Sequence, residues 1–340
     1  MPRVTVLLPV RDQAATLLRA MQSILEQQWK DFQLLVLDDG SKDGSGEIAE
    51  GVRDSRVMVY RGEQAVGLPG ILNKGLTLSD SEYIARMDAD DWSHPQRLSA
   101  QIELLDSRHE VAACGTAVWV VSPDGRRRVR RYPKTHEEIK ARLLFENALA
   151  HPATVLRRSS LERWKLAYDD RFTKSQDYDL WERLSRVAKL ENIGKPYLEY
   201  RVQPHTSTRA GVQRDLADKV RLRQLEALGV DATEMQLQLH LGLCNWSAPL
   251  VASRANEVEQ WLKRLLDANA ASGIYEIGAF RAEILTRFRR VCRMISVHGE
   301  NGWSYWHRAS VLRGNGYHPE DYLRLPFWFR AWMRSASNSG

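Results

Sequence analysis

Three groups of aspartates in this 340-residue chain have a spacing that suits catalysis or metal binding. They are Asp38–Asp39, the group Asp88–Asp91 with its Asp-x-Asp pattern, and Asp177 with Asp179. Two carboxylates two residues apart can point at one cation, and ligation by oxygen alone suits Mg²⁺ or Mn²⁺ better than zinc. A carboxylate can also accept the proton of an attacking hydroxyl as a general base. The three groups therefore predict metal-assisted transfer chemistry.

Each group also has a structural explanation. Asp favours turns and helix N-caps, and Asp38–Asp39 precedes Gly40 in a typical turn sequence. Asp177 and Asp179 stand at the predicted start of a helix, where the helix dipole favours carboxylates. The functional interpretation rests on the combination, because the first two groups each follow a predicted strand of one sheet and the third follows in order.

The elements that must position these groups alternate between strand and helix in the first part of the chain. The predicted strands cover residues 4–8, 33–37, 56–60, 82–87 and 111–121, and the predicted helices cover residues 17–25, 47–52, 69–78 and 95–107. This alternation gives right-handed βαβ units, so we expect an α/β fold with a mostly parallel central sheet flanked by helices. Ligands bind outside the carboxyl ends of such strands, where Asp38–Asp39 and Asp88–Asp91 would lie.

The rest of the chain divides into two parts. Residues 122–210 carry a less regular pattern, and from Gly211 onward the pattern is helical only. We predict a catalytic domain over residues 1–210 and a helical C-terminal region over residues 211–340 that contacts an acceptor, a membrane surface or another copy of the chain. Three scattered cysteines, the lack of a long apolar run and an early charge at the start are typical of a cytoplasmic protein.

The net charge of +6 comes mainly from basic residues in Arg126–Arg131 and in the C-terminal third. Arg126–Arg131 flanks the predicted turn Ser122–Gly125, so a solvated hairpin explains it, and an anionic acceptor is the functional alternative. Too few aromatic residues stand beside it for nucleic-acid binding. Aromatic residues alternate with arginines between Trp303 and Arg334, which suits a helix at the inner membrane surface, a small helical core or an oligomer contact.

Six motifs then give the chain a resemblance to a known family. They are Val6–Asp12, Leu37–Ser41, Tyr83–Asp91, His151–Thr154, Gln176–Trp181 and Tyr200–Val202. In identity, order and spacing they resemble family 2 glycosyltransferases across residues 3–208. The resemblance implies a GT-A fold and an inverting hexosyltransferase. It would move a sugar from a nucleotide-diphospho-sugar, here a UDP-sugar, to a hydroxyl of a glycan or lipid-linked glycan acceptor in polysaccharide biosynthesis.

The resemblance also implies a donor site and a metal site. Its implied donor-binding residues are Pro9, Val10, Asp12, Asp39, Asp88 and Ala89. Asp39 would meet the base, and Asp88 the ribose or the donor sugar. Asp90 and Asp91 would hold the Mn²⁺ or Mg²⁺ that stabilises charge on the departing diphosphate. His205 falls in a loop that closes over the diphosphate in many relatives, so it is a further candidate metal ligand, with a solvent-facing position as the alternative.

Asp177 is the catalytic base that the resemblance implies, and Asp179 is the competing candidate. Gln176 stands where the family often has Glu, which leaves the base intact but removes one acidic neighbour. His151 and Trp181 are further candidates for contact with the acceptor, although either could simply pack in the core. A base of this kind is needed because a sugar hydroxyl is a poor nucleophile until its proton is taken.

Two rival functions remain open at this point. A nucleotidyltransferase of related architecture also uses paired Asp residues and Mg²⁺, but it predicts a glycine-rich basic loop after the first strand, where this chain has Pro9–Gln13. A catalytically inactive protein that binds sugar nucleotides or acts as a scaffold would keep the donor site and would not need Asp177. No poised Cys or Ser motif is evident, which agrees with transfer that has no covalent enzyme intermediate.

Overall fold

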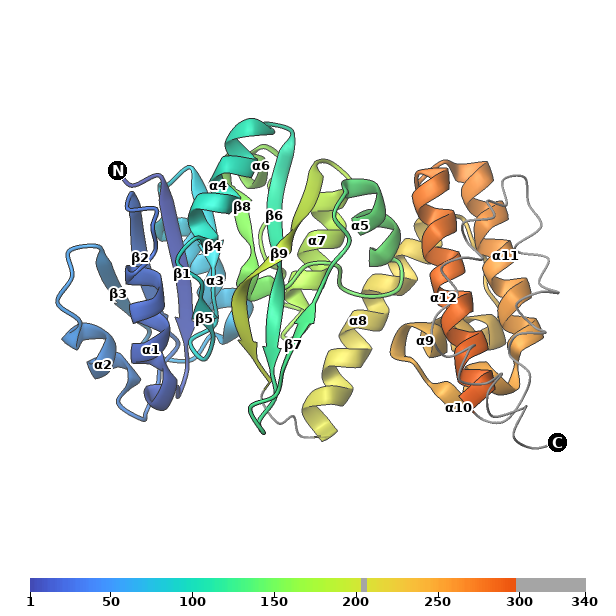
Figure 1. Ribbon diagram of the computed structural model, residues 1–340, viewed down its shortest axis with the longest axis horizontal. Coiled ribbons are helices and arrows are strands. Elements are labelled where there is room, and N and C mark those ends of the chain that lie inside the picture. The colour runs from blue at the N-terminus through green and yellow to red at the C-terminus, as the bar shows by residue number, and fades with distance from the viewer. Residues whose placement is uncertain (203–206, 298–340) are drawn as a thin grey trace, which may run out of the picture. The chain divides into compact units, whose positions relative to one another are not determined.

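The computed structural model describes residues 1–202 and 207–297 (Figure 1). The chain divides into two compact units, Met1–Gln224 and Leu225–Gly340. The sequence places a domain boundary after residue 210, near the start of helix α8 (Ser207–Ala227), whereas the first compact unit continues through most of that helix. All the candidate site residues belong to this first unit.

A single sheet forms the centre of the first unit. Its strands are β1 (Val4–Val10), β2 (Phe32–Asp38), β3 (Val57–Arg61), β4 (Tyr83–Arg86), β5 (Trp92–Ser93), β6 (Val111–Val121), β7 (Arg127–Arg130), β8 (Val155–Arg157) and β9 (Lys189–Arg201). Their order across the sheet is β3-β2-β1-β4-β8-β6-β9-β5, and β7 pairs with β6. Strands β3, β2, β1 and β4 are parallel, with Leu8 opposite Val36 and Val6 opposite Ala85. The predicted α/β class is confirmed.

The second half of the sheet is mixed, so the parallel pairing that we predicted is found among β1 to β4 and between β6 and β9. Strand β8 is antiparallel to β4 and β6, β7 is antiparallel to β6, β5 is antiparallel to β9, and β6 is parallel to β9. The turn Ser122–Gly125 connects β6 to β7, and Gly125 adopts the left-handed φ of 79° that this turn requires. Strand β9 contains Gly194 and Pro196 and shifts register against β6, which hides its strand pattern in the sequence.

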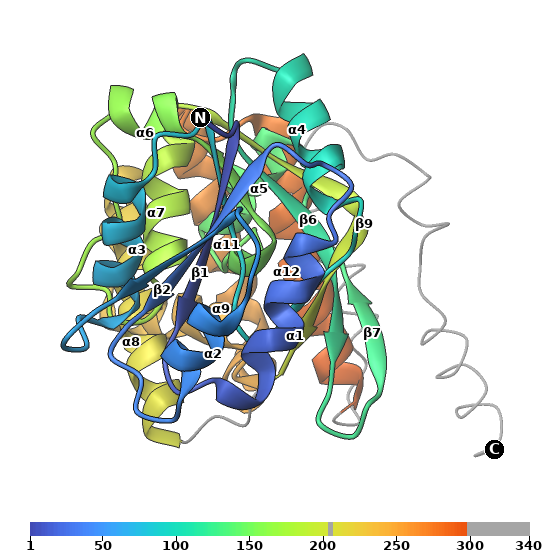
Figure 2. The ribbon, with the colours of Figure 1, turned by 90° about the vertical axis from the view of Figure 1, so that its left-hand side faces the viewer.

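Helices cover both faces of the sheet (Figure 2). On one face lie α1 (Ala14–Leu25), α2 (Ser45–Gly51) and α4 (Arg97–Ser107), and on the other lie α3 (Gly67–Leu78), α5 (His136–Leu143), α6 (Arg158–Arg163), α7 (Gln176–Ser185) and α8. Side chains alternate across a strand, so in β1 Val6 and Leu8 pack with the first group and Leu7 packs with the second. This burial on both faces fixes the register of β1 and thereby the position of its carboxyl end.

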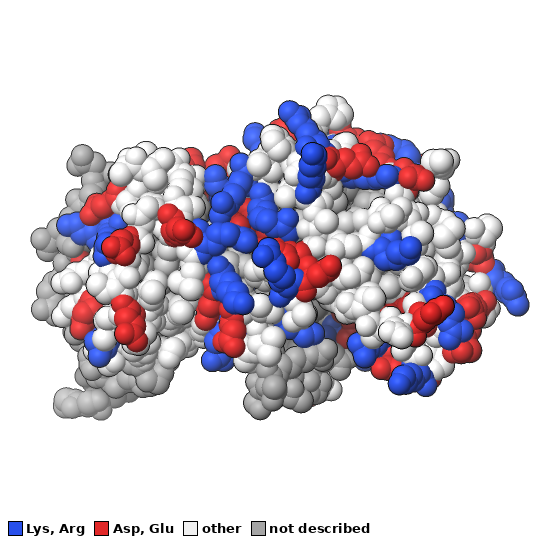
Figure 3. Space-filling model, turned by 180° about the vertical axis from the view of Figure 1, so that it is seen from behind, with Lys and Arg blue, Asp and Glu red and all other residues white. Residues whose placement is uncertain are grey.

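The Arg126–Arg131 run lies on the β6–β7 hairpin, and two of its members have acidic partners. Arg126 pairs with Asp124 at 2.6 Å, and Arg127 pairs with Glu199. Basic and acidic side chains also lie beside one another on the opposite face of the molecule, where Lys and Arg gather in a band with Asp and Glu next to them (Figure 3). A solvated hairpin with local ion pairs accounts for this run.

The second unit is helical over residues 225–297, the part of it that the structure describes. Its helices are α9 (Glu234–Asn245), α10 (Ala248–Ser253), α11 (Ala255–Ser272) and α12 (Ile277–Val297), after the end of α8. Trp261 packs edge-on against His240, and Phe280 is fully buried. Among the described residues, no helix combines the length and the apolar character that crossing a membrane requires. The Trp303–Arg334 stretch lies outside the described residues, so its membrane or oligomer contact stays a prediction.

Candidate active site

The carboxyl ends of β1, β2 and β4 meet at one edge of the sheet, because the three strands are parallel neighbours. Pro9 and Val10 end β1, Asp39 follows β2, and the Asp88–Asp91 group follows β4. Pro9 lacks a backbone N–H, and it is tolerated because the pairing of β1 with β4 stops at Leu7. The donor and metal residues that the sequence predicts are therefore brought to one side of the sheet.

Asp88, Asp90 and Asp91 form a compact acidic cluster at this edge, with ligand oxygens within 4.8 Å of one another. The Oδ1 of the buried Asp91 accepts a hydrogen bond from the backbone N–H of Arg201 at 2.9 Å, whereas its buried Oδ2 has no hydrogen-bond partner. Burial, with the charges of Asp88 and Asp90, raises the pKa of Asp91 well above its usual value. A hard divalent cation would give this oxygen a partner and offset the repulsion, so the cluster fits a cation of that class.

A buried arginine lies beside the cluster. Arg86, at the end of β4, binds both carboxylate oxygens of Asp88, one of them at 2.7 Å. Because Arg86 is 2% exposed, this fork-like contact is shielded from water and fixes the orientation of the Asp88 side chain. About a third of the Asp88 side chain, 32%, remains exposed and can face a ligand.

Asp177 stands in the first turn of α7 and is partly exposed. Its Oδ2 accepts a hydrogen bond from Asn147 Nδ2 at 2.6 Å. Burial raises the pKa of Asp177, while the backbone N–H of Tyr178, the charge of Arg86 and the Asn147 amide each act to lower it. A carboxylate with a raised pKa is a stronger base than an ordinary one, so this environment suits proton abstraction.

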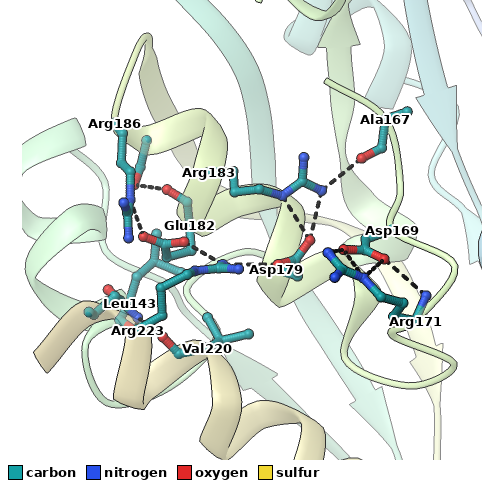
Figure 4. Close-up of polar contacts among 12 residues, drawn as sticks. Leu143, Ala167, Asp169, Arg171, Asp179, Glu182, Arg183, Arg186, Val220 and Arg223 are labelled. Carbon is teal, nitrogen blue, oxygen red and sulfur yellow. Dashed lines mark hydrogen bonds and ion pairs between the residues drawn. The ribbon is translucent and has the colours of Figure 1, made fainter. Parts of the chain in front are cut away.

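The competing base candidate, Asp179, is placed differently. Its side chain is fully buried and forms ion pairs with Arg183 at 2.7 Å and with Arg223 at 2.9 Å (Figure 4). A buried carboxylate held by two arginines is closed to an acceptor hydroxyl. Asp177 is therefore the accessible member of the pair, and the assignment of the base to Asp177 rather than Asp179 stays a prediction.

His151 and Trp181 also lie in the core. His151 Nε2 is 2.8 Å from the hydroxyl of Tyr168, and its ring packs edge-on against Trp181, with centroids 5.9 Å apart. His151 is 5% exposed and Trp181 is 0% exposed, and burial together with Arg86 lowers the pKa of His151 well below its usual value. Both side chains therefore pack in the core, which is the alternative that the sequence left open, and an acceptor contact through either stays a prediction.

On the donor side, Asp39 accepts two backbone hydrogen bonds. They come from Val66 at 2.7 Å and Gly67 at 3.0 Å, at the N-terminus of α3. Asp12 is exposed, has a φ of 52° and accepts a hydrogen bond from the N–H of Lys42. Both carboxylates thus hold the loops that border this edge, and their predicted contacts with the nucleotide stay predictions.

Two other predicted residues have simple placements. Ala89 is 3% exposed and packs with the hydrophobic core. His205 lies outside the described residues, so its role as a metal ligand stays a prediction.

Comparison with known proteins identifies the N-terminal part of the chain. Residues 5–164 match the family described as Glycosyl transferase family 2. The chain therefore carries a glycosyl transferase family 2 domain over residues 5–164. An uncharacterized glycosyltransferase of Methanocaldococcus jannaschii is 29% identical over 54% of this chain and 64% of its own length. The O-antigen biosynthesis glycosyltransferase WbnJ of Escherichia coli is 29% identical over 57% of this chain and 77% of its own length.

The fold also has relatives among solved structures. The crystal structure of S. aureus TarS 1–349 in complex with UDP-GlcNAc superposes with a TM-score of 0.58 at 16% identity, over 88% of this chain and 92% of that chain. This likeness confirms the predicted GT-A fold with a helical C-terminal region. The family 2 domain covers residues 5–164. The alignment with the M. jannaschii relative covers just under two thirds of that protein's length.

Three contacts of the candidate residues were not predicted from the sequence. Asn147 contacts Asp177, Tyr168 contacts His151, and the backbone of Arg201 contacts Asp91. Asn147 and Tyr168 stand in loops with no strand or helix signal, and a backbone contact leaves no trace in residue type. Only the nearness of Asn147 to the His151–Thr154 motif could have drawn attention to it.

We expect Asn147→Ala to move the acid limb of the pH profile of kcat/KM to higher pH. The Asn147 amide lowers the pKa of Asp177, so its removal raises that pKa further, and the base stays protonated up to a higher pH. Arg86, Tyr132 and Tyr168, which also interact electrostatically with Asp177, all remain in the variant. An acid limb that does not move, or that moves to lower pH, would contradict this role of Asn147.

Proposed function

We propose that this protein is an inverting glycosyltransferase that moves a sugar from a UDP-sugar to a hydroxyl of a glycan or lipid-linked glycan acceptor. One observation carries the proposal. The acidic cluster, with its unpartnered buried oxygen, and the hydrogen-bonded carboxylate of Asp177 both lie close enough to Arg86 for its charge to act on their pKa values. The relatives support the substrate classes: WbnJ is named for O-antigen biosynthesis, ExoO of Rhizobium meliloti for succinoglycan biosynthesis, and the TarS structure was solved with UDP-GlcNAc.

In this proposal Asp90 and Asp91 hold Mn²⁺ or Mg²⁺. A bound divalent cation would supply compact positive charge for the diphosphate as it departs. Asp88, fixed by Arg86, presents its exposed part to the ribose or the donor sugar. Asp12 and Asp39 hold the loops beside the base, and Pro9 and Val10 form the floor of the nucleotide site at the end of β1.

Asp177 performs the proton transfer. The acceptor oxygen forms its bond to the anomeric carbon while the bond from that carbon to the diphosphate oxygen breaks, and the electron pair leaves with the diphosphate. The proton of the acceptor hydroxyl moves to the Asp177 carboxylate, which Asn147 orients. A single displacement of this kind reverses the configuration at the anomeric carbon.

Screening sugar nucleotides by thermal unfolding, with and without Mn²⁺, tests the donor class. We expect at least one UDP-sugar to raise Tm, because a ligand at one hundred times its Kd adds about 2.7 kcal/mol to the free energy of unfolding. The shift should depend on Mn²⁺ and should be absent for nucleotides without the diphosphate. If no sugar nucleotide changes Tm under either condition, the proposed donor class is wrong.

The match of residues 5–164 to glycosyl transferase family 2 favours the transferase over the rival nucleotidyltransferase. A nucleotidyltransferase would release diphosphate from a nucleoside triphosphate, so an assay with UTP and a sugar phosphate separates the two. Peripheral contact with the inner face of a membrane depends on the stretch from Trp303 onward and stays a prediction.

A further inference from the structure

Helix α8 contacts the segment that carries the partner of Asp177. Arg221 donates to the backbone oxygen of Phe145 at 3.0 Å, and Gln224 donates to the backbone oxygen of Leu143 at 2.7 Å. Arg221 and Gln224 are both buried, at 6% and 5% exposure, so these contacts are protected from water. They hold the chain directly before Asn147, whose amide binds Asp177.

The same helix also contacts α7, which carries Asp177. Arg223 pairs with Asp179 at 2.9 Å and with Glu182, and both carboxylates are buried (Figure 4). Asp179 and Glu182 are three residues apart and therefore lie on one face of α7. One guanidinium thus bridges two turns of that face and opposes rotation and sliding of α7 against α8.

Arg223 contacts a different face of α7 from the face that carries Asp177. Successive residues of an α-helix are about 100° apart, so Asp177 and Asp179 point about 200° apart around α7. Asp179 points toward Arg223, and Asp177 points toward Asn147. Loss of the Arg223 contacts could therefore change the orientation of α7 and move the Asp177 carboxylate, although Arg223 binds Asp179 and not Asp177.

We infer that helix α8 positions the catalytic base, with Arg223 as its main positioning residue. Arg223 fixes α7, which carries Asp177, while Arg221 and Gln224 fix the segment that carries Asn147. All three residues of α8 lie beyond residues 5–164, the part of the chain that matches the family domain. The inference rests on the proposed function, since it takes Asp177 as the base.

The arrangement allows Arg223 to be replaced without leaving a buried charge unpaired. Asp179 keeps its ion pair with Arg183, and Glu182 keeps its ion pair with Arg186. The Arg223 side chain is itself 33% exposed. We therefore expect the Arg223 variants to fold while α7 loses its bridge to α8.

The test compares Arg223→Ala and Arg223→Gln with Arg214→Ala, which removes an exposed arginine from the same helix. A base displaced by an ångström can cost a factor of roughly 10² in rate, so kcat should fall by about that factor in both Arg223 variants. Affinity for UDP in the presence of Mn²⁺ should be unchanged, because the donor residues lie at the ends of β1, β2 and β4. Arg214→Ala should behave as the wild type.

A double-variant series separates positioning from a general loss of structure. Arg223→Ala should have little further effect on the residual rate of Asp177→Asn, because a displaced base cannot matter once the base is gone. If Arg223→Ala keeps the wild-type kcat, or lowers UDP affinity and kcat together, the inference is overturned. Failure of the wild-type protein to transfer sugar from any nucleotide would instead overturn the proposed function, so the two failures are distinguishable.

Discussion

Asp177→Asn is expected to lower kcat for sugar transfer by about 10²–10⁴-fold, the contribution typical of a positioned general base. The amide has the same shape as the carboxylate but cannot take the proton of the acceptor hydroxyl. The affinity for UDP with Mn²⁺ should be retained, since Asp177 lies at the start of α7 and not in the acidic cluster after β4. Transfer assays at saturating donor, together with titration of UDP, measure both effects.

The Asp177→Asn protein should also be at least as stable as the wild type at neutral pH. The pKa of Asp177 is raised by burial, which means that the folded protein disfavours the ionised form, and the neutral amide removes that cost. Asp215→Asn, an exposed Asp to Asn change on α8, serves as the matched control and should leave rate and affinity unchanged. Normal transfer by Asp177→Asn would show that another group takes the proton.

Asp91→Asn is expected to remove the dependence of activity on Mn²⁺ or Mg²⁺ together with most of the activity. Loss of several kcal/mol of charge stabilisation on the departing diphosphate corresponds to a fall in kcat of about 10³-fold. Asn can still accept the hydrogen bond from the N–H of Arg201 through its oxygen. The oxygen that lacks a hydrogen-bond partner, however, becomes an amide nitrogen, which does not ligate a hard cation.

Asp91→Asn should lose activity without losing thermal stability. Without metal, Asp91→Asn relieves the repulsion among three clustered carboxylates, so its Tm should equal or exceed that of the metal-free wild type. Added Mn²⁺ should raise Tm in the wild type only. EDTA should stop transfer by the wild type, and added Mn²⁺ or Mg²⁺ should restore it. Full wild-type activity in EDTA would exclude the metal role of Asp90 and Asp91.

The sequence predicts the strands that deliver the site residues because their signals are local. The apolar runs at residues 4–8 and 33–37 correspond to β1 and β2, and the carboxylates after them lie where parallel strands end. Strand β9 was missed because Gly194, Pro196 and the alternating charged residues around them give no continuous strand pattern. Its pairing with β6 depends on contacts between distant segments, which residue type does not record.

The choice between Asp177 and Asp179 shows the same limit. Both residues suit the first turn of a helix, and their types do not differ. What separates them is Arg223, which lies on a later helix and binds only Asp179 of the two. Likewise, His151 belongs to a motif that resembles the family, yet its partner Tyr168 encloses it in the core. The motifs thus indicate a candidate site, and tertiary contacts decide which of its residues are accessible.

The anomeric configuration of the sugar that the protein first releases tests the central claim most directly. The protein would be incubated with an α-linked UDP-sugar and Mn²⁺, with water in place of the acceptor, and followed by proton NMR. Direct displacement assisted by Asp177 predicts that the β-anomer forms first, before mutarotation mixes the two. First release of the α-anomer, or no cleavage of any sugar nucleotide by the wild-type protein, would contradict the proposed mechanism.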